Sequence, residues 1–237
     1  MTTLYLIRHG QTDNNIIDCF NGILSDQPLN KTGMEMAAGL TKAFADVRLD
    51  AIYASPLKRA YMTAEGVRGE RDMEILTDPD LMEMSFGAWD GLTYKQAKAR
   101  DPELIRTWKK DFAHFCAPDG GETSKDVATR VFRAVLHIVR AHRGETVAIA
   151  AHGLALHLLL VKLLRCPVAK YRRYQGFYNA AYGVLEIEDD GHFRITAWGK
   201  RDHYKPEQVR PPRRRLVRRN MEAVLAKRHY HPAMRVE

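Results

Sequence analysis

The sequence predicts an α/β fold in which helices cover both faces of a sheet. Short apolar runs typical of strands alternate with stretches whose apolar residues recur at helical spacing. This alternation favours a sheet flanked by helices. The chain has 237 residues, of which 45% are hydrophobic, enough for one large domain with a substantial core.

Two strand–helix pairs are predicted in the first part of the chain. Residues 3–8 (TLYLIR) form an apolar run that ends in polar residues, which predicts a first strand. A loop over 16–30 separates it from a helix over 31–47. A second short strand is predicted over 50–56, and a helix over 57–67 begins directly after its closing proline.

The rest of the chain continues the alternation after an irregular, glycine-containing stretch. The long helix that follows has its apolar residues on one face. In order, the sequence predicts an irregular segment over 77–94, a helical region over 93–115 broken at Asp101-Pro102, a turn over 117–123, a long amphipathic helix over 124–142, a strand over 145–153, an apolar helix over 154–165, and a hairpin of 180–188 and 192–198 that turns at 189–191.

The net charge of +8 belongs to the C-terminal part of the chain. Residues 199–237 contain twelve Lys or Arg and four Asp or Glu, whereas residues 1–198 carry 25 charges of each sign. We therefore predict a domain over 1–198 and a basic, partly extended C-terminal extension over 199–237, with a short helix around Met221, Val224 and Leu225.

The arginine cluster of the extension, RPPRRRLVRR, could bind nucleic acid or an acidic membrane surface by charge alone. It lacks interleaved aromatic residues and a recognisable nucleic-acid-binding fold, so no specific nucleic acid is expected. We favour a solvated arm, or one that packs across the domain or a partner subunit. A homodimer remains open.

Several classes of protein are disfavoured by the composition. No run approaches the roughly 20 apolar residues that cross a bilayer, and the N-terminus lacks the features of a secretory signal. The three cysteines, Cys19, Cys116 and Cys166, are scattered and form no CxxC pair, which is typical of reduced thiols in a cytoplasmic protein. We expect a cytoplasmic location and no metal site.

Cationic side chains follow the three predicted parallel strands. Arg8-His9 closes the first, Arg59 lies one turn into the helix after the second, and His152-Gly153 closes the third. In an open α/β sheet, ligands bind at the carboxyl ends of the strands. Two arginines and two histidines at one edge need an anion at their centre, and arginine grips phosphate with paired hydrogen bonds.

The other groups that phosphoryl transfer requires are also available. One imidazole would attack, and the second would donate to the equatorial oxygens. Glu83, in an irregular loop, could supply the proton for the departing alkoxide. Asn15 and backbone N–H groups around Gly10 and Gly153 could add neutral donors.

Five motifs in order, RHGQTDNN, SPLKRAYMTAE, EMSFGAWDG, PDGGET and AAHG, resemble those of the histidine phosphatase superfamily, also called phosphoglycerate-mutase-like. The match spans about residues 3–198. The resemblance implies a three-layer α/β/α sandwich with a mostly parallel central sheet. The family often has Glu at the position of Gln11 and an aromatic residue at that of Asn14, neither of which belongs to the core chemical groups.

The resemblance also implies roles for individual residues. By position, His9 is similar to the nucleophile that becomes phosphohistidine, and Glu83 to the proton donor. Arg8 and Arg59 resemble the phosphate clamps, and His152 the second histidine. Further substrate contacts are expected from Asn15 and Gly153. No metal and no cofactor is implied. The like charge of Arg8 should help to keep His9 neutral.

The family contains both phosphatases and mutases. Only 28 residues separate Trp89 from Pro118, and they lack the long Arg- and Pro-rich insertion of the cofactor-dependent mutases, so we favour a phosphoric monoester hydrolase of the histidine acid phosphatase type. A phosphoglycerate mutase and a non-catalytic phosphate-binding regulatory module are the alternatives.

The expected partner is a small phosphomonoester, such as a sugar phosphate, phosphoglycerate, phosphoserine or α-ribazole phosphate. A predicted lid region contains Trp89, Lys95, Lys109, Lys110 and His114. Its Lys and His side chains could read a second anionic group on the substrate, although a solvated helix face is the simpler interpretation.

Overall fold

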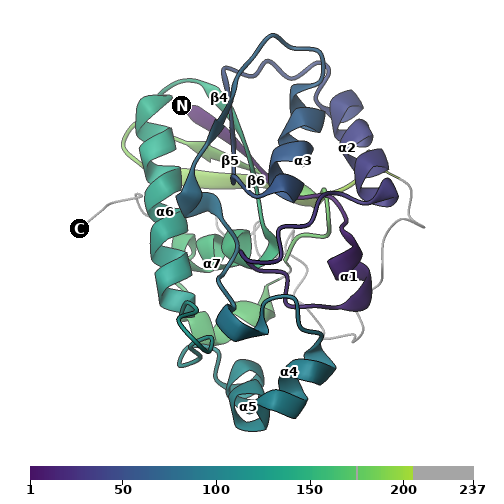
Figure 1. Ribbon diagram of the computed structural model, residues 1–237. Helices are drawn as coiled ribbons and strands as arrows, with labels where there is room; N and C mark the ends of the chain where they lie inside the picture. The colour runs from purple at the N-terminus through teal and green to yellow at the C-terminus, as the bar shows by residue number, and fades with distance from the viewer. Residues whose placement is uncertain (175, 205–237) are drawn as a thin grey trace.

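The computed structural model describes residues 1–174 and 176–204, which form a sheet with helices on both faces (Figure 1). The α/β class predicted from the sequence is confirmed. The elements, in chain order, are β1 (Thr2–Arg8), α1 (Asp13–Ile17), α2 (Lys31–Ala43), β2 (Ala51–Ala54), α3 (Lys58–Arg68), β3 (Ile75–Thr77), α4 (Tyr94–Arg100), α5 (Pro102–Lys110), α6 (Ser124–Ala141), β4 (Thr146–Ala151), α7 (Gly153–Leu163), β5 (Tyr182–Ile187) and β6 (Phe193–Lys200), with short 3-10 turns at Pro79–Leu81, Gly87–Trp89 and Val168–Arg173.

The six strands form one sheet in the order β3-β2-β4-β1-β5-β6. The first four in this order are parallel, and β5 and β6 are antiparallel, so the sheet is mostly parallel. The central position of β1 and β4 explains their apolar sequences, because a parallel strand covered on both faces has no polar face.

Two hydrophobic clusters, one on each face of the sheet, join it to the helices that form the outer layers of the sandwich. The residues of β4 alternate between them: Val147 and Ile149 belong to the cluster with α6 and α7, whereas Ala148 and Ala150 belong to the cluster with α2 and α3. Figure 1 shows the same division, with α2 and α3 on one side of the sheet and α6 and α7 on the other. The sheet edge is therefore held rigidly from both faces.

Helices α4 and α5 lie at one end of the molecule (Figure 1). Their region contains an aromatic cluster in which Trp108 contacts Phe112 and Phe115 with ring centroids 4.8 and 4.9 Å apart. Trp89 is wholly buried, and its indole N–H donates to Asp101 at 2.7 Å. Trp89 is therefore a core residue of this region, whereas Lys95, Lys109, Lys110 and His114 are exposed.

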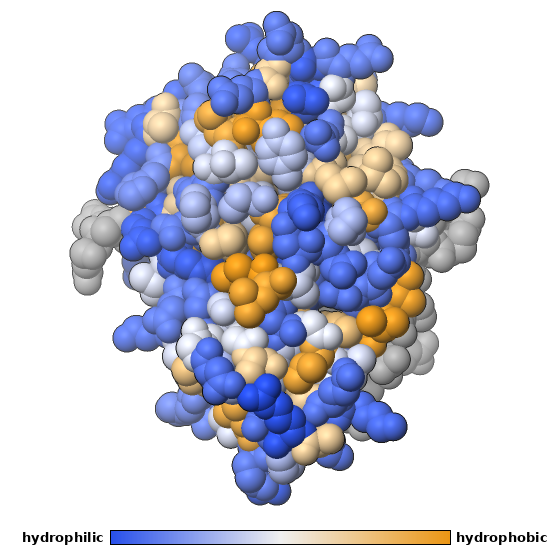
Figure 2. All heavy atoms as spheres, viewed as in Figure 1, coloured by the Kyte–Doolittle hydropathy of each residue, from blue (hydrophilic) through white to orange (hydrophobic). Residues whose placement is uncertain are grey.

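The surface seen in Figure 2 is mainly hydrophilic, with small apolar patches between charged side chains. Among the described residues, the large apolar side chains that remain exposed are Met1, Ile16, Ile17, Leu24, Met34 and Leu76. Scattered apolar side chains are normal on a protein surface. The described residues contain no helix that is long and apolar enough to cross a membrane.

Two short elements escaped the sequence analysis. Helix α1 begins ahead of the predicted loop and enters it, and β3 has three residues, of which only Ile75 is buried. Elements this short carry no periodic pattern. The break at Asp101-Pro102 and the β5–β6 hairpin turn lie where predicted. The helix predicted around Met221 lies outside the described residues.

Gly87, in the loop that carries Glu83, packs directly against the turn at Pro118. Its φ is +53°, and a Cβ added there would overlap the Pro118 carbonyl oxygen. We expect Gly87→Ala to lower the free energy of unfolding by more than about 2 kcal/mol, because it adds a backbone collision to the strain of a left-handed conformation. Gly120 has φ of +82° with open space around it, so Gly120→Ala should cost only about 1 kcal/mol. Denaturant unfolding of the two variants tests this difference, and equal costs would contradict it.

Candidate active site

The ends of β1, β2 and β4 are aligned at one edge of the sheet. The register places Arg8 beside Ala151. The ladder continues one residue further, because His9 N–H donates to the Ala151 carbonyl and Ser55 N–H to the Ala150 carbonyl, both at 2.9 Å. The first residues after these three parallel strands, His9, Ser55 and His152, therefore lie close together.

His9 is 3% exposed, and its ring orientation is fixed by the backbone. Its Nδ1 lies 2.7 Å from the carbonyl oxygen of Gly10. Because a carbonyl only accepts, Nδ1 carries the ring proton and Nε2 holds the lone pair. The Gly10 N–H donates to Thr63 Oγ1 at 2.9 Å, so this backbone donor serves the loop itself rather than the anion proposed from the sequence.

The second histidine, His152, is wholly buried, and its ring centroid lies 5.2 Å from that of His9. Its Nε2 is 2.8 Å from Ser55 Oγ, which accepts from Leu57 N–H and so can donate its own proton. This favours the tautomer with a proton on Nδ1. Within residues 1–174 and 176–204, that Nδ1 has no hydrogen-bond partner. His152 is thus arranged to donate from Nδ1.

Each arginine of the cluster is held by backbone carbonyls on one side only. Arg8 Nη1 donates to Phe177 O at 2.7 Å, and Arg59 Nη2 donates to Asn21 O and Gly22 O at 3.2 and 2.9 Å. Arg8 Nε, Arg59 Nε and Arg59 Nη1 are buried with no partner in the described part of the chain.

With His152 Nδ1, these make four buried donors without an acceptor. A buried donor left unsatisfied costs about 1–3 kcal/mol. An oxyanion has the acceptor atoms that these donors lack.

Glu83 is 7% exposed. Among the acidic side chains, Glu83 does most to raise the pKa of the guanidinium groups of Arg8 and Arg59. Its Oε1 accepts from the N–H groups of Met84 and Ala155, both at 3.0 Å, and its Oε2 accepts from Leu154 N–H at 3.1 Å. Two of these donors belong to the first turn of α7, where a carboxylate also interacts favourably with the helix dipole. The side chain is therefore held in one orientation.

The two histidines are strongly biased towards their neutral forms. Burial lowers the pKa of His9 well below its usual value, and the charges of Arg59 and Arg8 lower the pKa further. Burial and Arg59 likewise dominate the lowered pKa of His152. The contribution of Arg8 expected from the sequence is confirmed, but burial and the charge of Arg59 lower the pKa of His9 more.

Hydrogen bonds from neighbouring residues orient the side chain of Asn15, and one of these neighbours, Asn179, was not identified from the sequence. The amide oxygen of Asn15 accepts from Thr12 N, from Thr12 Oγ1 and from Asn179 Nδ2, at 3.1, 3.2 and 3.0 Å. Asn179 Nδ2 also donates to the carbonyls of His9 and Gly10, both at 3.1 Å. The side chain of Asn179 therefore joins the two ends of the first motif from 164 residues away in the sequence.

Gly153 lies against Arg8 at the start of α7. A Cβ on Gly153 would be 3.1 Å from Arg8 Nε, so the absence of a side chain lets the guanidinium group approach the helix. The structure thus brings together Arg8, His9, Arg59, Glu83, His152 and Gly153, with Asn15 beside His9. A substrate contact from the Gly153 backbone stays a prediction.

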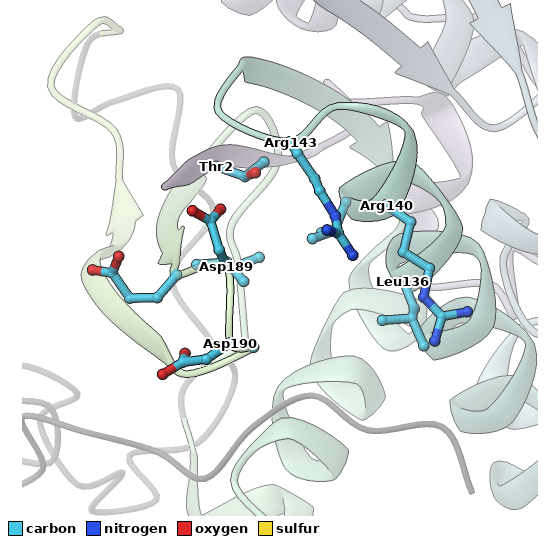
Figure 3. Close-up of a pocket in the computed structure, with 10 residues that line it drawn as sticks. Thr2, Leu136, Arg140, Arg143, Asp189 and Asp190 are labelled. Carbon is cyan, nitrogen blue, oxygen red and sulfur yellow. The ribbon is translucent and has the colours of Figure 1, made fainter.

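A separate pocket of about 150 Å³ lies between α6 and the β5–β6 hairpin (Figure 3). Thr2, at the start of β1, lines it together with Arg140, Arg143, Asp189 and Asp190. It contains none of the cluster residues, which follow the opposite ends of the strands. Among the described residues, no group of three or more His, Cys, Asp and Glu side chains could hold a metal ion.

Comparison with known proteins identifies the family. The model of the histidine phosphatase superfamily (branch 1) matches residues 4–201. The chain therefore belongs to the histidine phosphatase superfamily, as its motifs indicated.

Two curated relatives differ in their named activities. Phosphoserine phosphatase 1 of Hydrogenobacter thermophilus is 29% identical over 189 residues, covering 80% of this chain and 88% of the relative. The 2,3-bisphosphoglycerate-dependent phosphoglycerate mutase of Brucella anthropi is 36% identical over 169 residues, covering 68% and 81%. Three mycobacterial relatives, 37% identical over 162 residues, are longer, and the chain spans 43% of their length.

The fold is shared with solved structures. Bacillus stearothermophilus YhfR superposes with a TM-score of 0.81 at 35% identity, covering 86% of this chain and 99% of that one. This likeness and the layers described above confirm the three-layer sandwich.

The lowered pKa values give a direct prediction. In the free protein, the ring signals of His9 and His152 should stay constant from about pH 8 to about pH 6, where an unperturbed imidazole takes up a proton near pH 6.5. Saturating inorganic phosphate should raise the pKa of both, because its negative charge favours the protonated rings. An NMR titration with histidine-labelled protein measures this, and His9→Ala and His152→Ala assign the signals. A free-protein midpoint near pH 6.5 would contradict the prediction.

Proposed function

We propose that the chain is a metal-independent phosphomonoesterase of the histidine acid phosphatase type, which hydrolyses small phosphorylated metabolites through a phosphohistidine at His9. The observation that carries this proposal is the set of four buried, unpartnered donor nitrogens around a histidine with a free Nε2 lone pair. Donors arranged in this way are complementary to the equatorial oxygens of a phosphoryl group.

In the first step, His9 Nε2 attacks phosphorus in line, and the bond from phosphorus to the ester oxygen breaks. Arg8, Arg59 and His152 donate to the equatorial oxygens, where the charge of the transition state is spread. The protonated carboxyl group of Glu83 gives its proton to the departing alkoxide. Its Oε2 suits this role, because it accepts one backbone hydrogen bond where Oε1 accepts two.

In the second step, the carboxylate of Glu83 takes a proton from water, and the water oxygen attacks phospho-His9. The bond from phosphorus to Nε2 breaks, and inorganic phosphate leaves. Glu83 is then protonated again and ready for the next cycle. The bond from His9 Nδ1–H to the Gly10 carbonyl keeps the ring in the same orientation in both steps.

A phosphoglycerate mutase is the alternative within the family. It would use the same phosphohistidine but return the phosphoryl group to a second hydroxyl group instead of water. The relative named as such a mutase favours this alternative. The 28 residues between Trp89 and Pro118 favour hydrolysis, because they fold into α4, α5 and their aromatic core without a long insertion.

A truncation after Tyr204 is the best test of whether the basic extension has a role. Strand β6 runs to Lys200, and His203 Nε2 lies 3.0 Å from the Ala180 carbonyl, so an earlier cut would remove contacts of the domain. Ala180 is bonded to His9 through its N–H at 3.1 Å. A cut after Tyr204 therefore separates any role of the extension from damage to the loop that carries His9.

Wild-type protein should release inorganic phosphate from a panel of small phosphomonoesters in the presence of EDTA, and His9→Ala should lower turnover by about three orders of magnitude or more, as is typical for a covalent nucleophile. His137→Ala is the matched control, because this exposed histidine of α6 belongs to no part of the proposed site and should leave turnover unchanged.

Each other outcome assigns a different function. Interconversion of phosphoglycerates with a bisphosphoglycerate primer, without net hydrolysis, would replace the phosphatase with the mutase. Absence of both activities, with phosphate still bound, would replace it with a non-catalytic phosphate-binding module.

A further inference from the structure

The loop that carries Glu83 is bound by a single arginine from α6. Arg130 Nη1 donates to the carbonyl oxygens of Asp80 and Met82, at 2.9 and 2.7 Å, and Arg130 Nη2 donates to the carbonyl oxygen of Glu83 at 2.8 Å. Three carbonyls within four residues of an irregular segment are thus fixed by one guanidinium group. Between the 3-10 turns at Pro79–Leu81 and Gly87–Trp89, the loop has no helix or strand that could do the same.

The guanidinium group is itself fixed by Glu122, in the turn before α6. Arg130 Nε donates to Glu122 Oε1 at 2.7 Å, and Nη2 donates to Oε2 at 2.8 Å, which is a bidentate pair. The Glu122 Oε2 also accepts from Ser85 N–H at 2.8 Å, and the Glu122 N–H donates to Ser85 O at 3.0 Å. The loop is therefore held on both sides of Glu83.

The two ends of Glu83 are held by different helices. Its backbone carbonyl is bonded to Arg130 of α6, and its carboxylate is bonded to the first turn of α7. The side chain of Arg130 is 13% exposed, so little water competes for these bonds. Without Arg130, the Glu83 carboxylate would still be bonded to α7, but the Glu83 carbonyl would lose its bond to α6 and the backbone could shift.

We propose that Arg130 is a positioning residue that, with Glu122, sets the place of the Glu83 carboxyl group relative to the ester oxygen. This inference rests on the proposed function, because it concerns the proton transfer of that reaction. A misplacement of about 1 Å can cost about 100-fold in rate, and general acid catalysis contributes about 100- to 10,000-fold. Arg130 does not touch the substrate in this account. Its charge also lowers the pKa of His152, less than burial and Arg59 do, and that effect is common to all esters.

The dependence of the rate on the leaving group separates this role from a general structural one. An alkoxide needs a proton as it departs, so hydrolysis of glycerol phosphate requires the acid. Dinitrophenolate departs as a stable anion, so the first step with dinitrophenyl phosphate does not need the acid. The ratio kcat/KM reports this first step, because water attacks phospho-His9 only after the leaving group has departed. The attack by His9 and the charge stabilisation by Arg8, Arg59 and His152 are the same for both esters.

The experiment compares kcat/KM on the two esters for wild type, Glu83→Gln, Arg130→Ala and Arg133→Ala. Arg130→Ala should lose about 100-fold on glycerol phosphate and no more than about threefold on dinitrophenyl phosphate. Glu83→Gln should show the same selectivity with a larger loss. Both results are measured on the full chain, after circular dichroism and thermal unfolding confirm the fold of each variant.

Arg133 provides the matched control. It lies on the same helix, three residues on, and its Nε and Nη2 donate to the Asp80 carboxylate of the same loop at 2.9 and 2.7 Å. It makes no bond to Glu83 among those described, and its side chain is 56% exposed. Arg133→Ala should stay within about threefold of wild type on both esters, as expected for an exposed ion pair.

If Arg130→Ala does not fold, Arg130→Lys takes its place. A lysine keeps the charge but cannot reproduce the planar, forked set of donors, so the same selective loss is expected. Equal losses on both esters, or no loss on either, would overturn the role of Arg130 while leaving the function at His9 intact. An inactive wild type would overturn the proposed function, and the inference with it.

Discussion

The burial of positive charge at one sheet edge is the constraint on which the rest of the site depends. Arg59 and His152 are wholly buried, and each keeps at least one donor nitrogen without a partner in the described part of the chain. Such groups cost free energy in the folded protein. Binding of an oxyanion would offset this cost, so in the proposed function the groups that destabilise the free protein provide affinity for phosphate. Burial also lowers the pKa of His9, which favours the neutral ring whose lone pair attacks in the proposed mechanism.

The proposed acid, Glu83, and the proposed nucleophile, His9, are held by separate parts of the fold. The aligned ends of the parallel strands fix the positions of His9, His152 and the two arginines. Bonds from Asn179 to the carbonyls of His9 and Gly10 add to this support. Glu83 depends instead on α6 and α7, through Arg130 and the first turn of α7. If the proposed function holds, changes to one set should impair proton transfer while phosphate binding is retained, and changes to the other should do the reverse.

Much of the fold and of the cluster could be predicted from the sequence because each depends on local patterns. The apolar run before Arg8-His9 and the one before His152-Gly153 are strands with unambiguous ends, and the rule for ligand sites in open sheets then brings these residues together. Strand β3 is too short to carry a pattern. Asn179 and Arg130 escaped detection because their contacts lie 170 and 47 residues away in the chain, and nothing in their own surroundings marks them. The irregular loop made Glu83 a candidate proton donor, and the family resemblance implied the same role for it.

The most direct test of the central claim is to isolate the covalent intermediate. During turnover of a phosphomonoester labelled in its phosphoryl group, rapid alkaline quenching and peptide mapping should place the label on the peptide that contains His9. The linkage should be stable in base and labile in acid, as a phosphoramidate is, and it should appear and decay as fast as phosphate is released. Turnover without labelled protein, or with the label on a residue other than His9, would contradict the account.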